Sequence, residues 1–197
     1  PFRHYFGHGY SPEFVVTQIC QHPANMIIYK DKISGDELFS DTYPMTLVDE
    51  VLFRVVGKQE TIAAEDYDAA IGANPSAEEA SEGVDDSAIS AINVVHANRL
   101  VETGFDKKGY MVYIKDYMKK VKEDLTANNP DRLKVFSENI QGAVKKIIGE
   151  FKEYQFYQGE SMNADGMVVL MKWEDGADGN EVPIFYFFKD GLDEEKV

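Results

Sequence analysis

The chain has 197 residues and a formal net charge of −15, which suits one domain and disfavours a general nucleic-acid binder because phosphate repels such a surface. Hydrophobic content of 44% and aromatic content of 12% can build a real core, which excludes a wholly disordered protein. No apolar run approaches the roughly 20 residues of a membrane-spanning helix. The single cysteine, Cys20, excludes an intramolecular disulfide framework and favours a reducing compartment.

The first 25 residues read unlike the remainder. They lack the charged start, apolar centre and small-residue cleavage site of a signal peptide. His4 and His8 have the spacing of a helical metal pair, but the glycines around them disfavour the helix that this pairing requires. We therefore expect residues 1–25 to form a poorly ordered extension.

From Met26 onward, strand-like and linker-like segments alternate. Short apolar runs predict strands at Met26–Asp31 and within Val48–Lys58. The acidic, turn-rich segment Ile71–Asp86 has the composition of a linker. Apolar residues on both parities of Ala88–Gly104 predict a long strand there, although a helix is also compatible with the pattern.

Two helices are predicted next, at Phe105–Asn129 and from Asp131 to about Glu150. Apolar residues at spacings of three and four form one stripe on each: Tyr110, Tyr113, Ile114, Tyr117, Val121 and Leu125, then Leu133, Phe136, Ile140, Val144, Ile147 and Ile148. Asn129 and Pro130 supply an N-cap and a first-turn proline. So short a connection predicts an antiparallel helical hairpin at about 106–150.

Charge is unevenly distributed along the chain. Residues 105–152 hold eleven Lys/Arg and seven Asp/Glu, a balance of +4, which leaves nine basic and twenty-eight acidic residues, or −19, in the rest. A basic arm on an acidic body suggests a partner with an acidic patch. Two ordinary solvated helix faces would explain the same pattern.

The C-terminal third is rich in strand patterns, at Glu153–Glu160, Gly166–Glu174 and Val182–Gly191. The segment DGADGNE between the last two lacks EF-hand spacing and flanking helices, so we expect a β-turn. No glycine-rich phosphate loop, G-x-S-x-G or H-E-x-x-H motif occurs. The residues thus predict an α+β binding module and not an enzyme.

Five blocks closely resemble the translationally controlled tumour protein family, also called fortilin or histamine-releasing factor. They are MIIYKDKISGDELFSD at Met26–Asp41, IGANPSAEE at Ile71–Glu79, YIKDYMKKVK at Tyr113–Lys122, FKEYQFYQGESMNADGMVVLMKW at Phe151–Trp173 and FFKDGLDEEK at Phe187–Lys196. The resemblance covers 26–197 in order, and places 1–25 outside the family.

This resemblance implies a fold and a setting. The fold is a β-tent of twisted, mainly antiparallel sheets with a projecting helical hairpin and a long mobile loop at about 64–87. It is similar to a chaperone of nucleotide-free Rab GTPases. The family is non-enzymatic and cytoplasmic, with members also nuclear or secreted without a signal peptide.

The resemblance also implies partners: small GTPases of the Rheb kind, translation elongation factors, tubulin and anti-apoptotic proteins. The GTPase-facing residues correspond to Glu37, Leu100 and Glu160. Two acids around an exposed leucine would suit a basic switch region, whereas by composition alone both glutamates are ordinary surface acids. The tubulin-contacting residues correspond to the lysines of the first helix: Lys115, Lys119, Lys120 and Lys122.

Weak calcium contacts in the family correspond to Asn74 and Gln155, and two amides supply too few oxygens for tight binding. No other cofactor is implied. Three positions depart from the family pattern. Val197 replaces a terminal cysteine that can form an intermolecular disulfide, Gln158 replaces an apolar residue or threonine, and Ala69 replaces a phosphorylated serine.

Overall fold

The computed structural model describes residues 26–62, 89–176 and 179–197. The predicted N-terminal extension and the whole of the predicted loop at 64–87, with Ala69 and Asn74, lie outside these ranges. No helix in the described ranges is long and apolar enough to cross a membrane.

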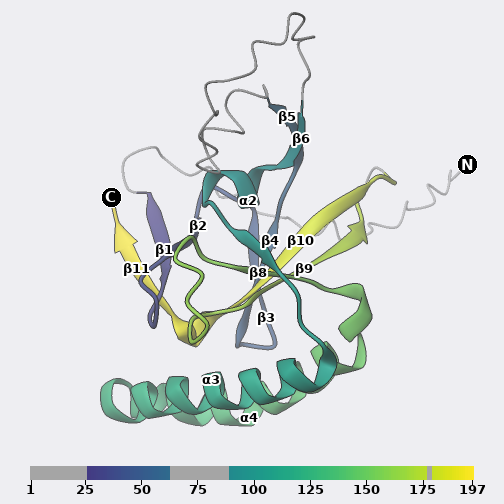
Figure 1. Ribbon diagram of the computed structural model, residues 1–197. Helices are drawn as coiled ribbons and strands as arrows, with labels where there is room; N and C mark the ends of the chain where they lie inside the picture. The colour runs from purple at the N-terminus through teal and green to yellow at the C-terminus, as the bar shows by residue number, and fades with distance from the viewer. Residues whose placement is uncertain (1–25, 63–88, 177–178) are drawn as a thin grey trace, which may run out of the picture.

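Three antiparallel sheets make up the β part of the fold (Figure 1). The first has the order β11–β1–β2, with bounds Leu192–Lys196, Ile27–Asp31 and Glu37–Ser40. The second has the order β3–β4–β10–β9–β8–β7, with bounds Met45–Val48, Leu52–Val56, Glu181–Phe188, Val169–Asp175, Gln155–Gln158 and Val101–Thr103. The third pairs β5 (Gln59–Ile62) with β6 (Ile89–Ile92). The predicted α+β class with antiparallel sheets is confirmed.

Aromatic side chains join the first two sheets. Phe39 of β2 is fully buried, stacks on Tyr29 at 4.5 Å between ring centroids, and lies 4.2 Å from Phe187 of β10. Phe53 of β4 closes the cluster at 6.1 Å from Phe39. Such ring pairs contribute about 0.5–1.5 kcal/mol each beyond their buried area, so this cluster fixes how the sheets meet.

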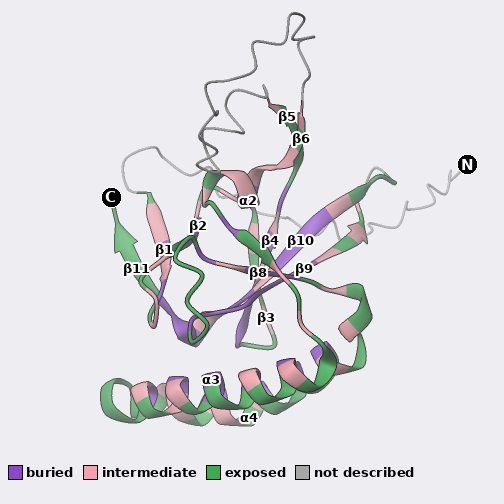
Figure 2. Cartoon of the chain, viewed as in Figure 1, coloured by how far each residue is buried: buried purple, intermediate pink, exposed green. Residues whose placement is uncertain are grey.

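Two long helices, α3 (Lys107–Asn128) and α4 (Pro130–Gly149), form the predicted antiparallel hairpin. Asp106 caps α3 by accepting the Gly109 N–H at 2.9 Å, and Asn129 caps α4 by accepting the Arg132 N–H at 3.2 Å. Figure 2 shows the buried residues of α3 along the side that faces the sheets. The predicted stripes are largely buried, together with two residues outside them, Met118 and Ala143.

The predicted long strand at Ala88–Gly104 is wrong. After β6 the chain forms the short helix α2 (Asn93–Ala97), and then a turn with Arg99 in the left-handed region at φ 51°, before β7 begins. The Asn93 carboxamide accepts the N–H groups of Lys58 and Val94, both at 2.8 Å, and Val94 is fully buried. These tertiary contacts override the strand preference of the β-branched residues.

The C-terminal strand-like runs are confirmed as β8, β9 and β10. The short 3-10 turn η1 (Phe151–Glu153) connects α4 to β8, and the 3-10 turn η2 (Lys189–Gly191) connects β10 to β11. DGADGNE connects β9 to β10, with Asp175 paired to Glu181 and the Gly176 N–H donating to the Asn180 carbonyl at 2.7 Å. Ala177 and Asp178 lie outside the described residues, so the β-turn expected there stays a prediction. Pro183 is tolerated because pairing of β10 with β4 begins only at Ile184, so the missing N–H is not needed on that side.

Candidate protein-binding site

Two loops converge at one corner of the sheets, and the buried carboxylate of Asp31 holds them together. Asp31 is only 1% exposed, and its Oδ2 accepts the N–H groups of Ser34 and Met167, each at 3.0 Å. Ser34 belongs to the β1–β2 loop, and Met167 to the β8–β9 loop. A single side chain therefore sets the position of both loops.

Asp36 makes a second link between these loops, closer to their tips. Its carboxylate accepts the Ser161 hydroxyl at 2.6 Å and the Ser161 N–H at 3.3 Å. Gly159 permits this approach, because a side chain there would overlap the Asp36 carboxylate. Glu37 follows Asp36 at the start of β2, and Glu160 lies between Gly159 and Ser161, so this contact brings the two glutamates to one corner.

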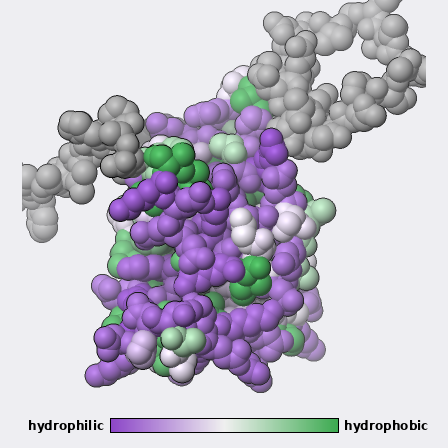
Figure 3. Space-filling view, turned by 90° about the vertical axis from the view of Figure 1, so that its left-hand side faces the viewer, coloured by the Kyte–Doolittle hydropathy of each residue, from purple (hydrophilic) through white to green (hydrophobic). Residues whose placement is uncertain are grey.

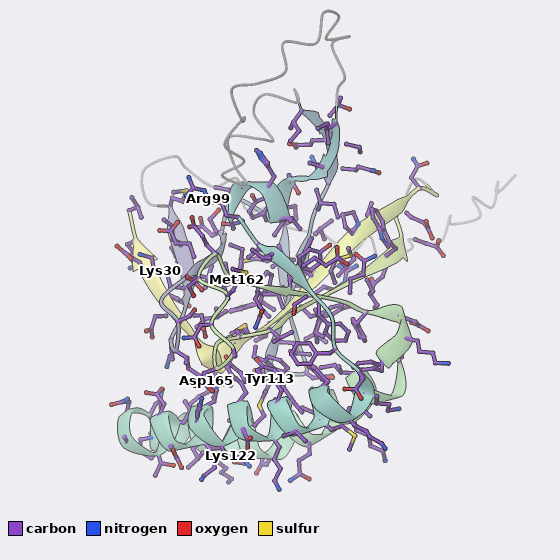
Figure 4. The ribbon with its side chains drawn as sticks, viewed as in Figure 1. Lys30, Arg99, Tyr113, Lys122, Met162 and Asp165 are labelled. Carbon is purple, nitrogen blue, oxygen red and sulfur yellow. The ribbon has the colours of Figure 1, made fainter. Side chains whose placement is uncertain are left out.

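The α2–β7 turn reaches the same corner. Arg99 Nη1 lies 2.9 Å from Glu160 Oε1, and both side chains are about three-fifths exposed. The strand that follows this turn also contacts the segment before Glu160, since Val101 of β7 pairs with Gln158 of β8. Arg99 has a left-handed backbone conformation, which is strained for a non-glycine residue, and such strain concentrates at functional sites. Figure 4 shows Arg99, Met162 and Lys30 on the half of the molecule that carries β1 and β2.

Glu37 lies at the edge of an acidic sheet face. Lys30 Nζ lies 2.5 Å from Glu195 and 3.5 Å from Glu37, so one lysine stands between two acids. Its hydrogen bond to Glu195 raises the pKa of Lys30 above the ordinary lysine value. Figure 3 shows this side of the molecule as mainly hydrophilic, with apolar atoms in separate small patches.

The expectation of an exposed Leu100 is wrong. Leu100 is 6% exposed, and its N–H donates to the Val95 carbonyl at 3.0 Å, because the left-handed turn at Arg99 directs it into the core. The more exposed of two apolar residues at this corner is Met162, at 60% exposure and φ 50°; Val101 is 38% exposed. Sequence reasoning missed Arg99, Asp36 and Met162; the repeated polar residues of QGESMN were the only signal of an exposed loop.

The four predicted tubulin-contacting lysines do not share one environment. Lys120 Nζ lies 2.6 Å from Asp165 and so faces the sheets. Lys119 is three-quarters exposed on the open side of α3, where it lies 3.9 Å from Glu123. Lys115 and Lys122 line an apolar groove between α3 and α4. Lys115, Lys119 and Lys122 are therefore available to a partner, whereas Lys120 is paired with the β8–β9 loop.

Ion pairs fix the hairpin on the sheets. Arg132 of α4 donates to both Asp190 oxygens, at 2.6 and 2.9 Å, and also to the Glu50 carbonyl. Lys146 of α4 pairs at 2.7 Å with Asp49. Asp49 and Glu50 both have positive φ, so α4 binds a strained β3–β4 turn.

Helix α3 also makes contacts that hold it on the sheets. Lys32 lies 2.8 Å from Asp124, and its hydrogen bond lowers the pKa of that carboxyl. The Tyr113 hydroxyl donates to the Gly166 carbonyl and accepts the Val168 N–H, both at 2.7 Å. A tyrosine hydroxyl is protonated at neutral pH and can serve both bonds, and burial raises the pKa of Tyr113 further.

The predicted calcium residues are only partly testable by geometry, since Asn74 lies outside the described ranges. Gln155 is exposed at the start of β8, and its carbonyl oxygen accepts the Tyr157 hydroxyl at 3.2 Å. Among described residues, no group of three or more His, Cys, Asp or Glu could hold a metal ion. Gln158 is half-buried, and its amide reaches the Asn163 carbonyl only at 3.5 Å.

Comparison with known proteins gives the family. The model of the translationally controlled tumour protein family matches residues 26–193. The chain belongs to the translationally controlled tumour protein family. It is 53% identical over 173 residues to the family member of Bombyx mori and 50% identical over 173 residues to that of Drosophila melanogaster. Each alignment covers 87% of this chain and 99% of the relative.

Two solved structures of the same family have a similar fold. The Schizosaccharomyces pombe protein p23fyp matches with a TM-score of 0.75 and 48% identity, covering 87% of this chain and 99% of its own. The Caenorhabditis elegans member matches with a TM-score of 0.64 and 34% identity, covering 87% and 98%. The sheets and hairpin described above are therefore the fold of translationally controlled tumour proteins.

Proposed function

We propose that this protein is a non-enzymatic binding protein that captures small GTPases of the Rheb kind, and translation elongation factors, through the corner formed by Glu37, Glu160 and Met162. The observation that carries the proposal is the convergence of three distant segments on one exposed corner. Hydrogen bonds from the Ser161 hydroxyl and N–H to the Asp36 carboxylate, and the Arg99–Glu160 ion pair, hold these segments together.

The chemistry of the corner suits a basic partner. Glu37 and Glu160 keep more than half of their side-chain surface exposed, at 54% and 62%. Met162 supplies the exposed apolar contact that Leu100 does not provide, and a flexible thioether adapts well to a partner surface. Carboxylates that are desolvated against a basic switch region would give both specificity and rapid association.

Replacing Glu37 with valine tests this proposal. Glu37→Val should lower the affinity for a nucleotide-free small GTPase by about tenfold or more, because a charge contact at the interface centre is lost. The fold should persist, since Lys30 keeps its closer partner Glu195 at 2.5 Å. Binding is measured by immobilised-GTPase capture, and folding by circular dichroism.

Glu181→Val is the matched control. Glu181 is an exposed acid at the start of β10, where the β9–β10 hairpin closes, so its replacement makes the same charge change outside the corner. Capture by this control should equal that of the unchanged protein. If Glu37→Val captured the GTPase as well as the unchanged protein does, the corner would not be the GTPase-binding surface.

An alternative function is that of a microtubule-associated and anti-apoptotic scaffold without a GTPase role. The observation in its favour is the open side of α3, where Lys119 is 75% exposed. Tubulin is acidic, so a basic helix face would attract it, and more strongly at low salt.

Charge reversal separates this alternative from a general charge effect. Lys119→Glu should reduce co-sedimentation with microtubules several-fold at low salt, whereas Lys120→Glu, whose lysine pairs with Asp165, should reduce it less. Equal losses in both variants would mean that net charge alone, and not this helix face, governs binding.

The proposal includes no required cofactor. Calcium binding, if it involves Gln155 and Asn74, would be weak because few oxygens are available. A cytoplasmic location is part of the same proposal, since GTPases, elongation factors and tubulin are found there.

A further inference from the structure

An apolar groove of about 400 Å³ runs between α3 and α4. Its walls come from Met111 and Met118 on α3, and from Ile140, Val144 and Ile148 on α4. This volume lies within the range of about 300–1,000 Å³ that is typical of ligand pockets. Met111 is 48% exposed, so the groove presents apolar surface to solvent.

The groove lies apart from the face that packs on the sheets. That face carries Tyr113 and Lys120, which contact Gly166 and Asp165 of the β8–β9 loop. Met111, Lys115, Met118 and Lys122 follow one another at spacings of four, three and four, so they form a separate row on α3. In Figure 4, Lys122 lies on the side of the hairpin turned away from the sheets.

The ionisable residues lining the groove are all basic. They are Lys115, Lys122 and Lys145, and none makes an ion pair with another residue in the described ranges. The other lysines of the two helices include three with acidic partners: Lys119, Lys120 and Lys146. In a chain of net charge −15, three unpaired lysines around an apolar floor form a local positive site.

We propose that this groove binds an amphipathic helix of a partner protein, with aliphatic side chains in the groove and Asp or Glu residues against the three lysines. The row from Met111 to Lys122 spans roughly 17 Å along α3, about three helical turns. That length accommodates aliphatic anchors at positions i, i+4 and i+7 of a docked helix. The surface is separate from the corner around Glu37, so this proposal does not depend on the proposed GTPase binding.

A designed peptide series tests the proposal on the full chain. The probe is an 18-residue, fluorescein-labelled helical peptide with leucine on one face and glutamate on both flanks. Two comparison peptides carry serine in place of leucine, or lysine in place of glutamate. Fluorescence anisotropy should show saturable binding of the first peptide alone. Binding of the serine peptide or the lysine peptide with equal affinity would overturn the proposal, as would the absence of binding by all three.

Methionine methyl groups locate the bound peptide by NMR. With ¹³C-methyl methionine, the signals of Met111 and Met118 should shift on addition of the glutamate–leucine peptide. Met162, which is exposed in the β8–β9 loop and does not line the groove, should not shift and is the internal control. Shifts confined to Met162 would place the binding outside the groove and contradict the proposal.

Charge reversal provides the matched variants. Lys115→Glu combined with Lys122→Glu should weaken peptide binding by about tenfold or more, because attraction becomes repulsion at both contacts. Lys58→Glu combined with Lys196→Glu makes the same charge change at two exposed positions, one in the β4–β5 connection and one in β11, and should leave affinity within about twofold. Equal weakening by the two double variants would overturn the proposal.

Two other occupants are outcomes of the same experiment. If the protein bound none of the peptides but bound phosphatidylserine vesicles, and the vesicles shifted the signals of Met111 and Met118, the occupant would be a membrane surface. Concentration-dependent dimerisation by sedimentation that is lost in the Lys115→Glu, Lys122→Glu variant would identify a second copy. Either result would contradict a partner helix.

Discussion

Replacing Arg132 with methionine is expected to lower the free energy of unfolding by about 3–5 kcal/mol, because it leaves a buried carboxylate without its partner. Asp190 is 4% exposed at the side chain, and Arg132 is 17% exposed. The guanidinium makes two bonds to this carboxylate and one to the Glu50 carbonyl. The hydrogen bond to Asp190 also raises the pKa of Arg132.

Urea denaturation followed by circular dichroism measures this change. The combined variant Arg132→Met, Asp190→Leu should recover most of the loss, because an apolar pair of similar volume removes the unpaired charge. A loss below about 1 kcal/mol for Arg132→Met alone would indicate that water reaches Asp190 and that the ion pair is of the weak surface type.

The same ion pair has a consequence for function. Arg132, Lys146 and Tyr113 attach both helices to loops of the sheets, which holds the hairpin in one orientation. The groove therefore faces away from the sheets while the Glu37 corner stays free. A GTPase and a docked helix could bind simultaneously, on surfaces with opposite charge.

The hairpin was the part of the fold that the sequence predicted best. Each of its stripes repeats over about four helical turns, and Asp106, Asn129 and Pro130 mark its ends through local chemistry. Local signals of this kind depend on neighbours within four residues, so no knowledge of the tertiary fold is needed. The resemblance to a known family then added the arrangement of the sheets.

The remaining features depend on contacts between distant residues. Strand β11 has one buried residue, Leu192, followed by four exposed ones, so its sequence lacks strand alternation; its pairing with β1 defines it. The break at Asn93 depends on Lys58, thirty-five positions away. The burial of Leu100 depends on the backbone angle of Arg99, which composition does not reveal.

The candidate site was predictable in the same uneven way. Glu37 and Glu160 were identified by resemblance to the family, and the structure brings their loops together. The hydrogen bond from Ser161 to Asp36 spans 125 positions, and no periodicity in the chain indicates it. The groove was equally hidden, because Lys115 and Lys122 appeared as part of one basic helix until α4 supplied the second wall.

Asp31→Ala is expected to lower the free energy of unfolding by about 3–5 kcal/mol, since each hydrogen bond to a charged acceptor contributes about 1.5–3 kcal/mol. The variant leaves the N–H groups of Ser34 and Met167 without their acceptor. Asp31→Asn keeps an oxygen acceptor and should lose less than half as much. A loss within about 1 kcal/mol for Asp31→Ala would mean that both N–H groups find water instead.

The effect of Asp31→Ala on GTPase capture distinguishes a residue that positions the two loops from a residue that contacts the GTPase. Asp31 is buried and does not reach the surface, yet it sets both loops that carry Glu37 and Glu160. We expect GTPase capture to fall together with stability in Asp31→Ala, whereas Glu37→Val lowers capture at unchanged stability. If Asp31→Ala lost stability but captured the GTPase normally at a temperature where it remains folded, the relative position of the two loops would not matter for binding. The contact would then involve one loop alone, and single substitutions at Glu37 and Glu160 would show which.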